Sequence, residues 1–258
     1  MKRILIFSGT TEGRRLAEHL KGSRAEVFVS VATEYGKECM EENENTRILS
    51  GRMDESEMEA FLARMRMDLV VDATHPFAVE VTRNIRQACA NTGTEYVRCL
   101  REAEKGVNMD GAVCVGSVPE AVRYLERTEG KILIATGSKE LKEYTKMEHY
   151  RERCYARVLS TLVSVEESIG LGFEGKHLIA MQGPFSKEMN LALLHQTGAK
   201  YFVTKESGKT GGFSEKAEAA REAGAVLVVV GRPEESGKTP EETMRFLDGW
   251  LSEKCRGV

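Results

Sequence analysis

The stretch RILIFSGTTEGRRLAEHL, residues 3–20, is typical of a buried strand, a glycine turn and an amphipathic helix in succession. Its apolar run is continuous rather than alternating, as expected for a strand covered on both faces of a parallel sheet. A glycine followed by a β-branched run recurs along the chain, in KGSRAEVFVSV, NTGTEYVRC, TEGKILIAT, QTGAKYFVT and EAGAVLVVV. Glycine at the left-handed position after a helix accounts for these joins. The repeated alternation predicts an α/β fold with right-handed crossovers.

The expected elements fall into two sets, separated by the polar stretch REAEKGVNMDG at 101–111. Strands are expected near 3–8, 26–31, 46–49, 69–72 and 95–98, then near 112–115, 131–135, 153–158, 177–181, 200–204 and 226–230. Helices are expected near 12–21, 55–65, 78–91 and 240–254. Capping-box spacing marks helix starts at Asp54, Ser117, Ser164 and Thr239.

The length of 258 residues favours two domains. We therefore predict two doubly wound Rossmann-like domains with largely parallel sheets, residues 1–102 and 103–258, and an interdomain cleft that holds the ligands. In such sheets ligands bind beyond the carboxyl ends of the strands.

Composition excludes several classes of protein. A net charge of −3 with interspersed signs gives no basic face for nucleic acid. No apolar stretch approaches the roughly 18 residues that span a bilayer, so no membrane association is expected. The six cysteines form no CxxC pair and HExxH is absent, so no metal site is predicted and the cysteines are expected to be reduced and buried. We expect a cytoplasmic protein.

The turn after the first strand, SGTTEGR at 8–14, is the first candidate site. Gly9 and Gly13 permit a tight turn, and threonine hydroxyls with backbone N–H groups at a helix N-terminus suit a pyrophosphate. The spacing departs from G-x-G-x-x-G, because Phe7 stands where the first glycine would be. An ordinary turn capped by Thr10 or Thr11 accounts for the spacing equally well.

The next two strand ends bear on the adenosine half of a dinucleotide. NAD-dependent enzymes usually carry an acidic residue for the ribose after the second strand. Thr33 and Tyr35 stand near that position, and Glu34 lies slightly beyond it in the sequence. No arginine is present there for a 2′-phosphate. The choice between NADH and NADPH stays open. Gly51 and Arg52 could lie along the adenosine, although an exposed arginine before a capped helix is an equal alternative.

The fourth strand ends at Asp72 and is followed by the loop ATHPFA. Thr74 and His75 are then expected beside the first turn, and Pro76 biases His75 toward an extended backbone. A histidine can donate a proton at neutral pH, so His75 is the candidate catalytic residue. In the simpler alternative, Thr74 and His75 only cap the helix that starts near Ala78.

Three loops in the second half combine glycine, hydroxyls and a lysine before a helix: TGSKEL from 136, QGPFSKEMN from 182 and TKESGKTGGF from 204. This composition suits carboxylates or phosphates. Each loop alone could be a capped helix start with a solvated lysine. The two SGKT segments, at 207–210 and 236–239, do not complete a P-loop. That motif, G-x-x-x-x-G-K-[ST], would require a further glycine at positions 203 and 232, where the chain has Val203 and Arg232.

The segments ILIFSGTTEGRRLAEHL, VVDATHPFA, MQGPFSKEMNLALL and VTKESGKTGGFSEKAEAA, in this order, resemble the precorrin-6A reductases of cobalamin biosynthesis. The resemblance covers nearly the whole chain. It implies reduction of a ring double bond of precorrin-6A, or of its cobalt-bearing counterpart, by NADPH or NADH. It also implies an anionic tetrapyrrole-derived macrocycle as substrate and other enzymes of the corrin pathway as possible partners.

The resemblance further implies that the cofactor lies on the N-terminal domain and that the macrocycle lies across the cleft. The cofactor-side candidates are Gly9, Thr10, Thr11, Glu12, Thr33, Gly51, Arg52 and Thr74. The substrate-side candidates are Ser138, Lys139, Gln182, Gly183, Ser186, Lys187, Lys205, Glu206, Ser207, Gly211 and Gly212. The competing hypotheses are another two-domain oxidoreductase, a non-catalytic dinucleotide- or tetrapyrrole-binding protein, and a methyltransferase.

Overall fold

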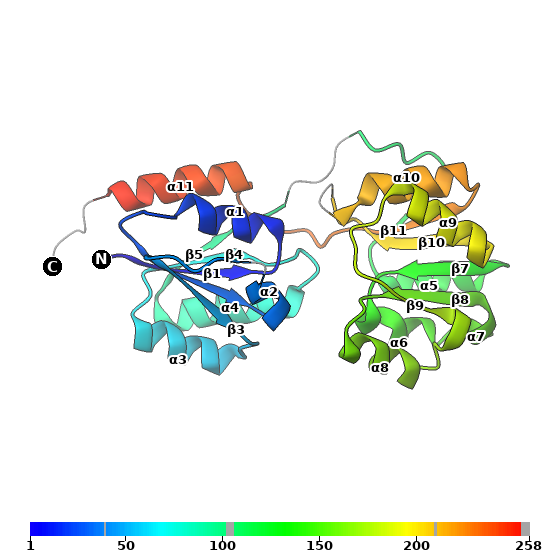
Figure 1. Ribbon diagram of the computed structural model, residues 1–258, viewed down its shortest axis with the longest axis horizontal. Coiled ribbons are helices and arrows are strands. Elements are labelled where there is room, and N and C mark those ends of the chain that lie inside the picture. The colour runs from blue at the N-terminus through cyan, green and yellow to red at the C-terminus, as the bar shows by residue number, and fades with distance from the viewer. Residues whose placement is uncertain (39, 102–105, 209–210, 254–258) are drawn as a thin grey trace. The chain divides into compact units, whose positions relative to one another are not determined.

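The computed structural model describes residues 1–258 except 39, 102–105, 209–210 and 254–258 (Figure 1). The chain forms two compact units, one of residues 1–102 with 234–258 and one of residues 103–233. The expected division after residue 102 coincides with a boundary between the units. The expected extent of the second domain does not, because the chain returns to the first unit after residue 233.

The sheet of the first unit has five parallel strands in the order β3-β2-β1-β4-β5. Their bounds are β1 Arg3–Ser8, β2 Glu26–Val31, β3 Thr46–Ser50, β4 Leu69–Ala73 and β5 Glu95–Arg98. Each lies within about one residue of its predicted range. The strand order reverses between β1 and β4, so these two strand ends flank the position where such sheets bind ligands.

Helices cover both faces of this sheet, as a doubly wound fold requires. They are α1 Thr11–His19, α2 Glu34–Glu38, α3 Glu55–Met65, α4 Val79–Thr92 and α11 Pro240–Ser252. Alternate residues of β1 pack on opposite faces: Ile4 and Ile6 lie in the core with Leu16, whereas Leu5 and Phe7 lie in the core with α3 and α4. The short helix α2 was not predicted from the sequence.

Helix α11 belongs to the first unit, which corrects the predicted domain assignment of the C-terminal segment. Leu247 is fully buried in the same core as Leu16 of α1. The two helices are also joined by an ion pair between Arg15 and Glu241, with 2.8 Å between Nη2 and Oε1. The segment that leads to α11 pairs beside β5, where the Lys238 N–H donates to the Arg98 carbonyl at 2.9 Å.

The second unit contains six parallel strands in the order β6-β11-β10-β7-β8-β9. Their bounds are β6 Val113–Val115, β7 Lys131–Ala135, β8 Cys154–Val158, β9 Leu178–Ala180, β10 Ala199–Lys205 and β11 Val226–Val230. The strand order reverses between β7 and β10. The loops after these two strands therefore flank a second potential ligand-binding position.

The helices of the second unit are α5 Val118–Glu126, α6 Leu141–Tyr144, α7 Tyr150–Arg153, α8 Leu162–Gly170, α9 Lys187–Thr197 and α10 Phe213–Glu222, with 3-10 turns at Ser138–Glu140 and Gly175–His177. Within this unit, α9 and α10 lie on one face of the sheet and α6 and α8 on the other (Figure 1). Helix α8 begins earlier than predicted, because Thr161 rather than Ser164 is its N-cap.

Two expectations from composition can be compared with the structure. Across the described residues, no helix is both long and apolar enough to cross a bilayer. Cys89, Cys99 and Cys154 are buried, and burial raises the pKa of the Cys99 thiol to about 11 and that of Cys154 to about 12. Cys114 is exposed, contrary to the expectation of burial, and Cys39 and Cys255 lie outside the described residues.

Candidate functional site

The turn between β1 and α1 is held against the end of β4. Thr10 is the N-cap of α1, and its hydroxyl accepts a hydrogen bond from the Gly13 N–H at 3.4 Å. The same hydroxyl donates to the Ala73 carbonyl at 2.9 Å. A Cβ added at Gly13 would lie 2.3 Å from Ser8 Oγ, whereas one added at Gly9 would meet no atom within 4 Å. Gly13 therefore permits close helix–strand packing, and Gly9 leaves open space above the turn.

This geometry fits the pyrophosphate of a dinucleotide. The first N–H groups of a helix have no partner within the helix and carry a partial positive charge, which favours a phosphate. The turn also lies where the strand order reverses, between β1 and β4. Gly9, Thr10 and Thr11 are thus brought to one position that suits the cofactor by shape and by charge.

Glu12 has a partner that the sequence did not indicate. Arg101 donates to both carboxylate oxygens of Glu12, at 3.0 Å from Nε and 2.9 Å from Nη2. Burial alone would raise the pKa of Glu12, but the hydrogen bonds and charge of Arg101, together with hydrogen bonds from the Glu12 N–H and Thr10, more than offset this effect, and the pKa lies below its usual value. Glu12 is therefore a neutralised carboxylate in the first turn of α1.

The residues expected along the adenosine lie at the ends of the neighbouring strands β2 and β3. Thr33 Oγ1 accepts from the Gly36 N–H at 3.1 Å, and the N–H of Gly51 donates to the Val31 carbonyl at 3.0 Å. Arg52 is exposed. The carboxylate of Glu34 accepts a hydrogen bond from the Ser50 hydroxyl. This edge thus carries both an acidic and a basic side chain.

The loop after β4 is fixed by a buried network around Asp72, which is fully buried. Asp72 Oδ1 accepts from the Thr74 N–H at 3.0 Å, from the Thr74 hydroxyl at 2.7 Å and from Arg98 Nη1 at 2.9 Å. Arg98 Nη1 also donates to the Thr74 carbonyl at 3.0 Å, and Nη2 is 2.9 Å from Glu235 Oε2. Arg98 thereby connects two carboxylates to the backbone of the loop.

His75 follows directly in this loop. Its Nδ1 accepts from the Phe77 N–H at 3.3 Å, so in the neutral ring the proton is assigned to Nε2. Ala78, the N-cap of α4, has no hydrogen bond from a capping side chain. The His75 carbonyl accepts from the Ala78 N–H at 2.8 Å, and the Thr74 hydroxyl lies 3.1 Å from that of Thr82, so both residues also contact the start of α4.

In the second unit, the loops after β7 and β10 are directly joined. Lys205 at the end of β10 forms an ion pair with Glu140, with 2.7 Å between Nζ and Oε1. Ser138 donates to Glu167 Oε2 at 2.9 Å, and Lys139 is exposed. These candidates lie together at the point where the strand order reverses.

The remaining substrate-side candidates occupy the two loops that precede α9 and α10. In the first, Gln182 is exposed, the Gly183–Pro184 peptide bond is cis, and Ser186 caps α9 by accepting from the Met189 N–H at 3.3 Å. Lys187 forms an ion pair with Glu222, at 2.8 Å between Nζ and Oε2. Ser186 thus caps the helix as the simpler alternative for this loop required, but Lys187 is paired rather than solvated.

In the loop before α10, the Ser207 hydroxyl donates to the Gly211 carbonyl at 3.0 Å. Gly212 is the N-cap of α10 with a φ of 65°, which favours glycine. Arg232 Nε lies 3.5 Å from Glu206 Oε1 and donates to the Glu206 carbonyl at 3.0 Å. The loop is thus held at both ends.

Sequence reasoning missed two buried cations beneath these loops, Arg157 in β8 and Lys216 in α10, which are 6% and 8% exposed. Arg157 interrupts the otherwise apolar run CYARV, and Lys216 lies on the helix face that also carries the buried Ala217 and Ala220. A charged residue at a position where the pattern requires an apolar one was the available signal.

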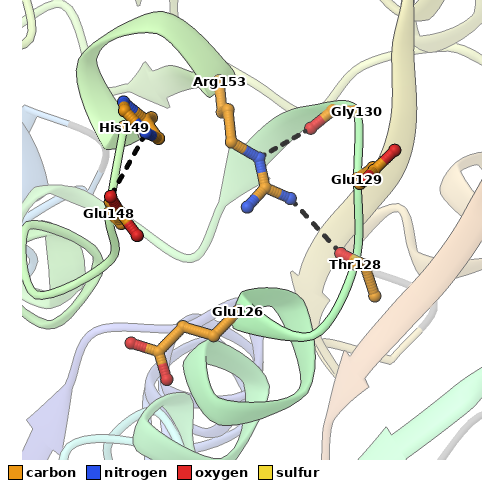
Figure 2. Close-up of a pocket in the computed structure, with 7 residues that line it drawn as sticks. All are labelled: Glu126, Thr128, Glu129, Gly130, Glu148, His149 and Arg153. Carbon is orange, nitrogen blue, oxygen red and sulfur yellow. Dashed lines mark hydrogen bonds and ion pairs between the residues drawn. The ribbon is translucent and has the colours of Figure 1, made fainter.

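A cavity of about 430 Å³ lies elsewhere in the second unit, near the first residues of β7 and β8 (Figure 2). Its lining includes three glutamates, and Arg153 donates to the Gly130 carbonyl at 3.0 Å and to the Thr128 hydroxyl at 3.3 Å. The lining residues are Glu126, Thr128, Glu129, Gly130, Glu148, His149 and Arg153. The acidic lining disfavours a polycarboxylate, and the cavity lies at the opposite ends of the strands from the candidate loops.

Among the residues that the structure describes, no three His, Cys, Asp or Glu side chains are grouped so that they could hold a metal ion. The two doubly wound parallel sheets define a Rossmann-like class of protein.

Comparison with known proteins identifies the family within this class. The family model described as precorrin-6x reductase CbiJ/CobK matches residues 3–248. Cobalt-precorrin-6A reductase of Methanothermobacter thermautotrophicus is 38% identical over 90% of this chain and 76% of the relative, and that of Priestia megaterium is 35% identical over 89% and 90%. A solved structure of the precorrin-6A reductase CobK aligns over the whole of both chains with 25% identity and a TM-score of 0.74. The chain belongs to the precorrin-6x reductase family and is an oxidoreductase.

Proposed function

We propose that this protein reduces a ring double bond of cobalt-precorrin-6A with a reduced nicotinamide cofactor, giving the 6B form in cobalamin biosynthesis. The observation that carries the proposal is the hydrogen bond from Thr10 to the Ala73 carbonyl, which holds the dinucleotide-type turn beside the His75 loop. The cobalt-bearing form is favoured because both relatives named above are cobalt-precorrin-6A reductases.

On the cofactor side, the N–H groups of the first turn of α1 and the Thr10 and Thr11 region would hold the pyrophosphate. Gly9 leaves room for it, and Thr33, Gly51 and Arg52 would lie along the adenosine. When bound, the nicotinamide supplies the hydride, and the protein contributes placement and the exclusion of water. Glu34 at the ribose edge would favour the 2′-hydroxyl of NADH, whereas Arg52 would favour the 2′-phosphate of NADPH. The test below therefore compares the two cofactors.

His75 would act at the nicotinamide end of this site. Its Nδ1 is committed to the Phe77 N–H, so Nε2–H is the group that can donate to the ring atom next to the reduced carbon. The buried Asp72–Arg98 network would keep the His75 loop in place during the reaction. Thr74 is the residue through which that network reaches the loop.

On the substrate side, the loops after β7, β9 and β10 would bind the carboxylates of the macrocycle. Lys139, Gln182 and Ser186 are exposed there and offer donors. Lys187 and Lys205 are paired with glutamates, and each would bind a carboxylate of the macrocycle either in place of its glutamate or together with it. The backbone around Ser207, Gly211 and Gly212 would supply further donors at the start of α10.

The direct test mixes purified protein with cobalt-loaded or metal-free precorrin-6A and with NADH or NADPH, while absorbance of the reduced nicotinamide is followed. We expect substrate-dependent loss of the band, fastest with the cobalt-loaded macrocycle. Cofactor binding without oxidation in all four mixtures would instead favour a binding protein.

The role of His75 is tested with His75→Gln, and His195→Gln, at an exposed position in α9, serves as the control. General acid catalysis contributes about 100-fold or more to a rate, so kcat should fall at least about 10-fold in His75→Gln while the dissociation constant of the cofactor changes less than about 3-fold. Unchanged kcat and unchanged cofactor affinity would remove His75 from the mechanism.

A further inference from the structure

Arg157 in β8 is a buried guanidinium with little compensation. Nη1 donates to Asn190 Oδ1 at 2.7 Å, and that oxygen is the one hydrogen-bond acceptor that the described residues offer it. The guanidinium carbon lies 4.2 Å from the ring centre of Phe185 and 5.5 Å from that of Phe202. No described carboxylate lies within ion-pair distance of it. Burial lowers the pKa of Arg157 to about 10.

Lys216 in α10 is the second buried cation at this place. Its Nζ donates to the Gly211 carbonyl at 2.7 Å and to the Ser207 hydroxyl at 3.3 Å, which leaves one of its three N–H groups over. Burial and then the charge of Arg157 lower the pKa of Lys216 to about 8, whereas Glu215 opposes this shift. The two cations therefore lie close enough to repel each other.

The surroundings add positive rather than negative potential. Asn190 and Lys216 stand in the first turns of α9 and α10, so both helices present their N-terminal ends here. The negative group that acts on Lys216 is Glu215, whose buried Oε2 has no hydrogen-bond partner among the described residues. Two buried cations and two helix N-termini thus face one carboxylate.

Two other arginines with little exposure, the buried Arg98 and the partly buried Arg101, are fully compensated. Arg98 contacts Asp72 and Glu235 at 2.9 Å each, and Arg101 forms two hydrogen bonds to Glu12. A buried charge without a partner costs several kcal/mol or more, so such a group is retained where a ligand supplies the missing charge. An excess of buried positive charge next to ligand-binding loops is the arrangement expected of an anion site.

We infer that Arg157 and Lys216 form a carboxylate-binding subsite beneath the loop 182–187 and beside Ser207 and Gly211, where one acidic side chain of the substrate completes the charge balance. That the ligand is the macrocycle rests on the proposed function. A carboxylate presents two acceptor oxygens, which match the unused donors of a guanidinium and an ammonium. The rings of Phe185 and Phe202 lie on the guanidinium group of Arg157 and hold it in position, and Ser207 links Lys216 to the loop above it.

The subsite is tested with Arg157→Gln and Lys216→Gln, with Arg157→Lys as the variant that keeps the charge. Lys200→Gln serves as the control, since Lys200 is exposed at the amino end of β10, at the opposite edge of the same sheet. Three quantities are measured: the dissociation constant of cobalt-precorrin-6A from the absorbance of the macrocycle, the dissociation constant of the nicotinamide cofactor, and Tm with and without succinate at constant ionic strength.

We expect the two charge-removing variants to bind the macrocycle at least 10-fold more weakly, with cofactor affinity within 2-fold of the wild type. Their Tm without ligand should equal or exceed that of the wild type, because an unpaired buried charge is removed, and their stabilisation by succinate should be lost. Arg157→Lys and Lys200→Gln should keep succinate stabilisation. A purely structural role would lower Tm and leave the macrocycle affinity of the folded variants unchanged, which would overturn the inference.

The succinate measurement separates the two proposals. If the wild type neither binds nor reduces the macrocycle but is stabilised by succinate in an Arg157- and Lys216-dependent way, the proposed function fails and the anion subsite stands. If the wild type reduces the macrocycle while both variants bind it and succinate as the wild type does, the subsite fails and the proposed function stands.

Discussion

Two clusters of buried charge near strand ends differ in one respect that matters for function. In the first unit, Arg98 is surrounded by Asp72, Glu235 and the Thr74 carbonyl, and every charge has a partner. In the second unit, Glu215 acts on Lys216, and no described carboxylate lies within ion-pair distance of Arg157. The first cluster fixes the loop that carries His75, and the second is incomplete without an anion.

The difference shows that burial of a charged group does not by itself reveal its role. A buried charge with all its partners is part of the structure, and removal of one member leaves the others uncompensated. A buried charge in excess is held in place by the rest of the fold and becomes favourable when a ligand arrives. The same kind of substitution should therefore have opposite effects on stability in the two clusters.

The largest effect is expected for Arg98→Met, which leaves Asp72 and Glu235 without their shared cation. Breaking a buried ion pair in this way costs about 3–5 kcal/mol of unfolding free energy. Urea denaturation at pH 7 measures the loss. Arg47→Met is the matched control, since Arg47 is 69% exposed and 3.6 Å from Glu26, and such surface pairs contribute at most about 1 kcal/mol. Equal losses of unfolding free energy in both variants would show that the buried Asp72 network stabilises the protein no more than a surface ion pair does.

The next effect concerns the pH dependence of stability, and it probes the incomplete cluster. The pKa of Lys216 is about 8 in the folded protein, below its ordinary value of 10.5, with Arg157 and Glu215 as the charged groups that face it. Between these pH values the unfolded chain binds the additional proton, so unfolding free energy rises with pH. The wild type should gain on the order of 2–3 kcal/mol relative to Lys216→Gln from pH 8 to 10.5. If the unfolding free energies of the two proteins change with pH in parallel, Lys216 has enough negative charge around it in the folded protein and the cluster is not incomplete.

A smaller effect is expected at the cofactor turn from Gly13→Ala. The new Cβ would lie 2.3 Å from Ser8 Oγ and 3.0 Å from Ser8 Cα, so the start of α1 must shift. Overpacking of this kind costs about 1–3 kcal/mol, and the shifted helix should also bind the nicotinamide cofactor more weakly. Gly9→Ala is the contrast, because its Cβ meets no atom within 4 Å and stability should change by less than about 0.5 kcal/mol. A destabilised Gly9→Ala protein with an intact Gly13→Ala protein would reverse this account of the turn.

The smallest effect is expected for the Glu12–Arg101 pair. The folded pKa of Glu12 lies below its ordinary value of 4.5, so the pair stabilises the folded state above pH 4.5. This stabilisation is lost as pH falls through the folded pKa. Urea midpoints between pH 6 and 3 should fall less steeply for Glu12→Gln than for the wild type, whereas the exposed Glu18→Gln should follow the wild type. An unchanged slope in Glu12→Gln would mean that Arg101 does not act on the protonation of Glu12.

Most of the fold could be predicted because the strands are buried on both faces. Runs such as RILIFS and VLVVV have no polar face to confuse their register, and the helices between them carry readable caps at Asp54, Ser117 and Thr239. The short helix α2 was missed, because five residues with a central glycine give no periodic pattern. The start of α8 was misplaced, because two hydroxyl residues three positions apart compete for the cap and Thr161 is the one that caps.

The sequence predicted only those site residues that directly follow a strand. Residues that follow a strand are necessarily at its carboxyl end, so Thr10, Thr74 and His75 could be placed at one edge of the first sheet. Their partners could not be found in this way, since Arg101 lies 89 residues from Glu12 and Glu235 lies 137 residues from Arg98. Ion pairs of such separation carry no local signal in a single sequence.

The sequence by itself therefore determined the α/β class, the strand positions and the set of loops that can hold ligands, because burial periodicity and turn chemistry are local properties. Only the tertiary structure decided that α11 returns to the first sheet, that Lys187 and Lys205 are paired, and that Arg157 and Lys216 are buried with too few anions. Charge compensation depends on distance in space, and the chain brings these groups together only when both sheets and their covering helices have formed.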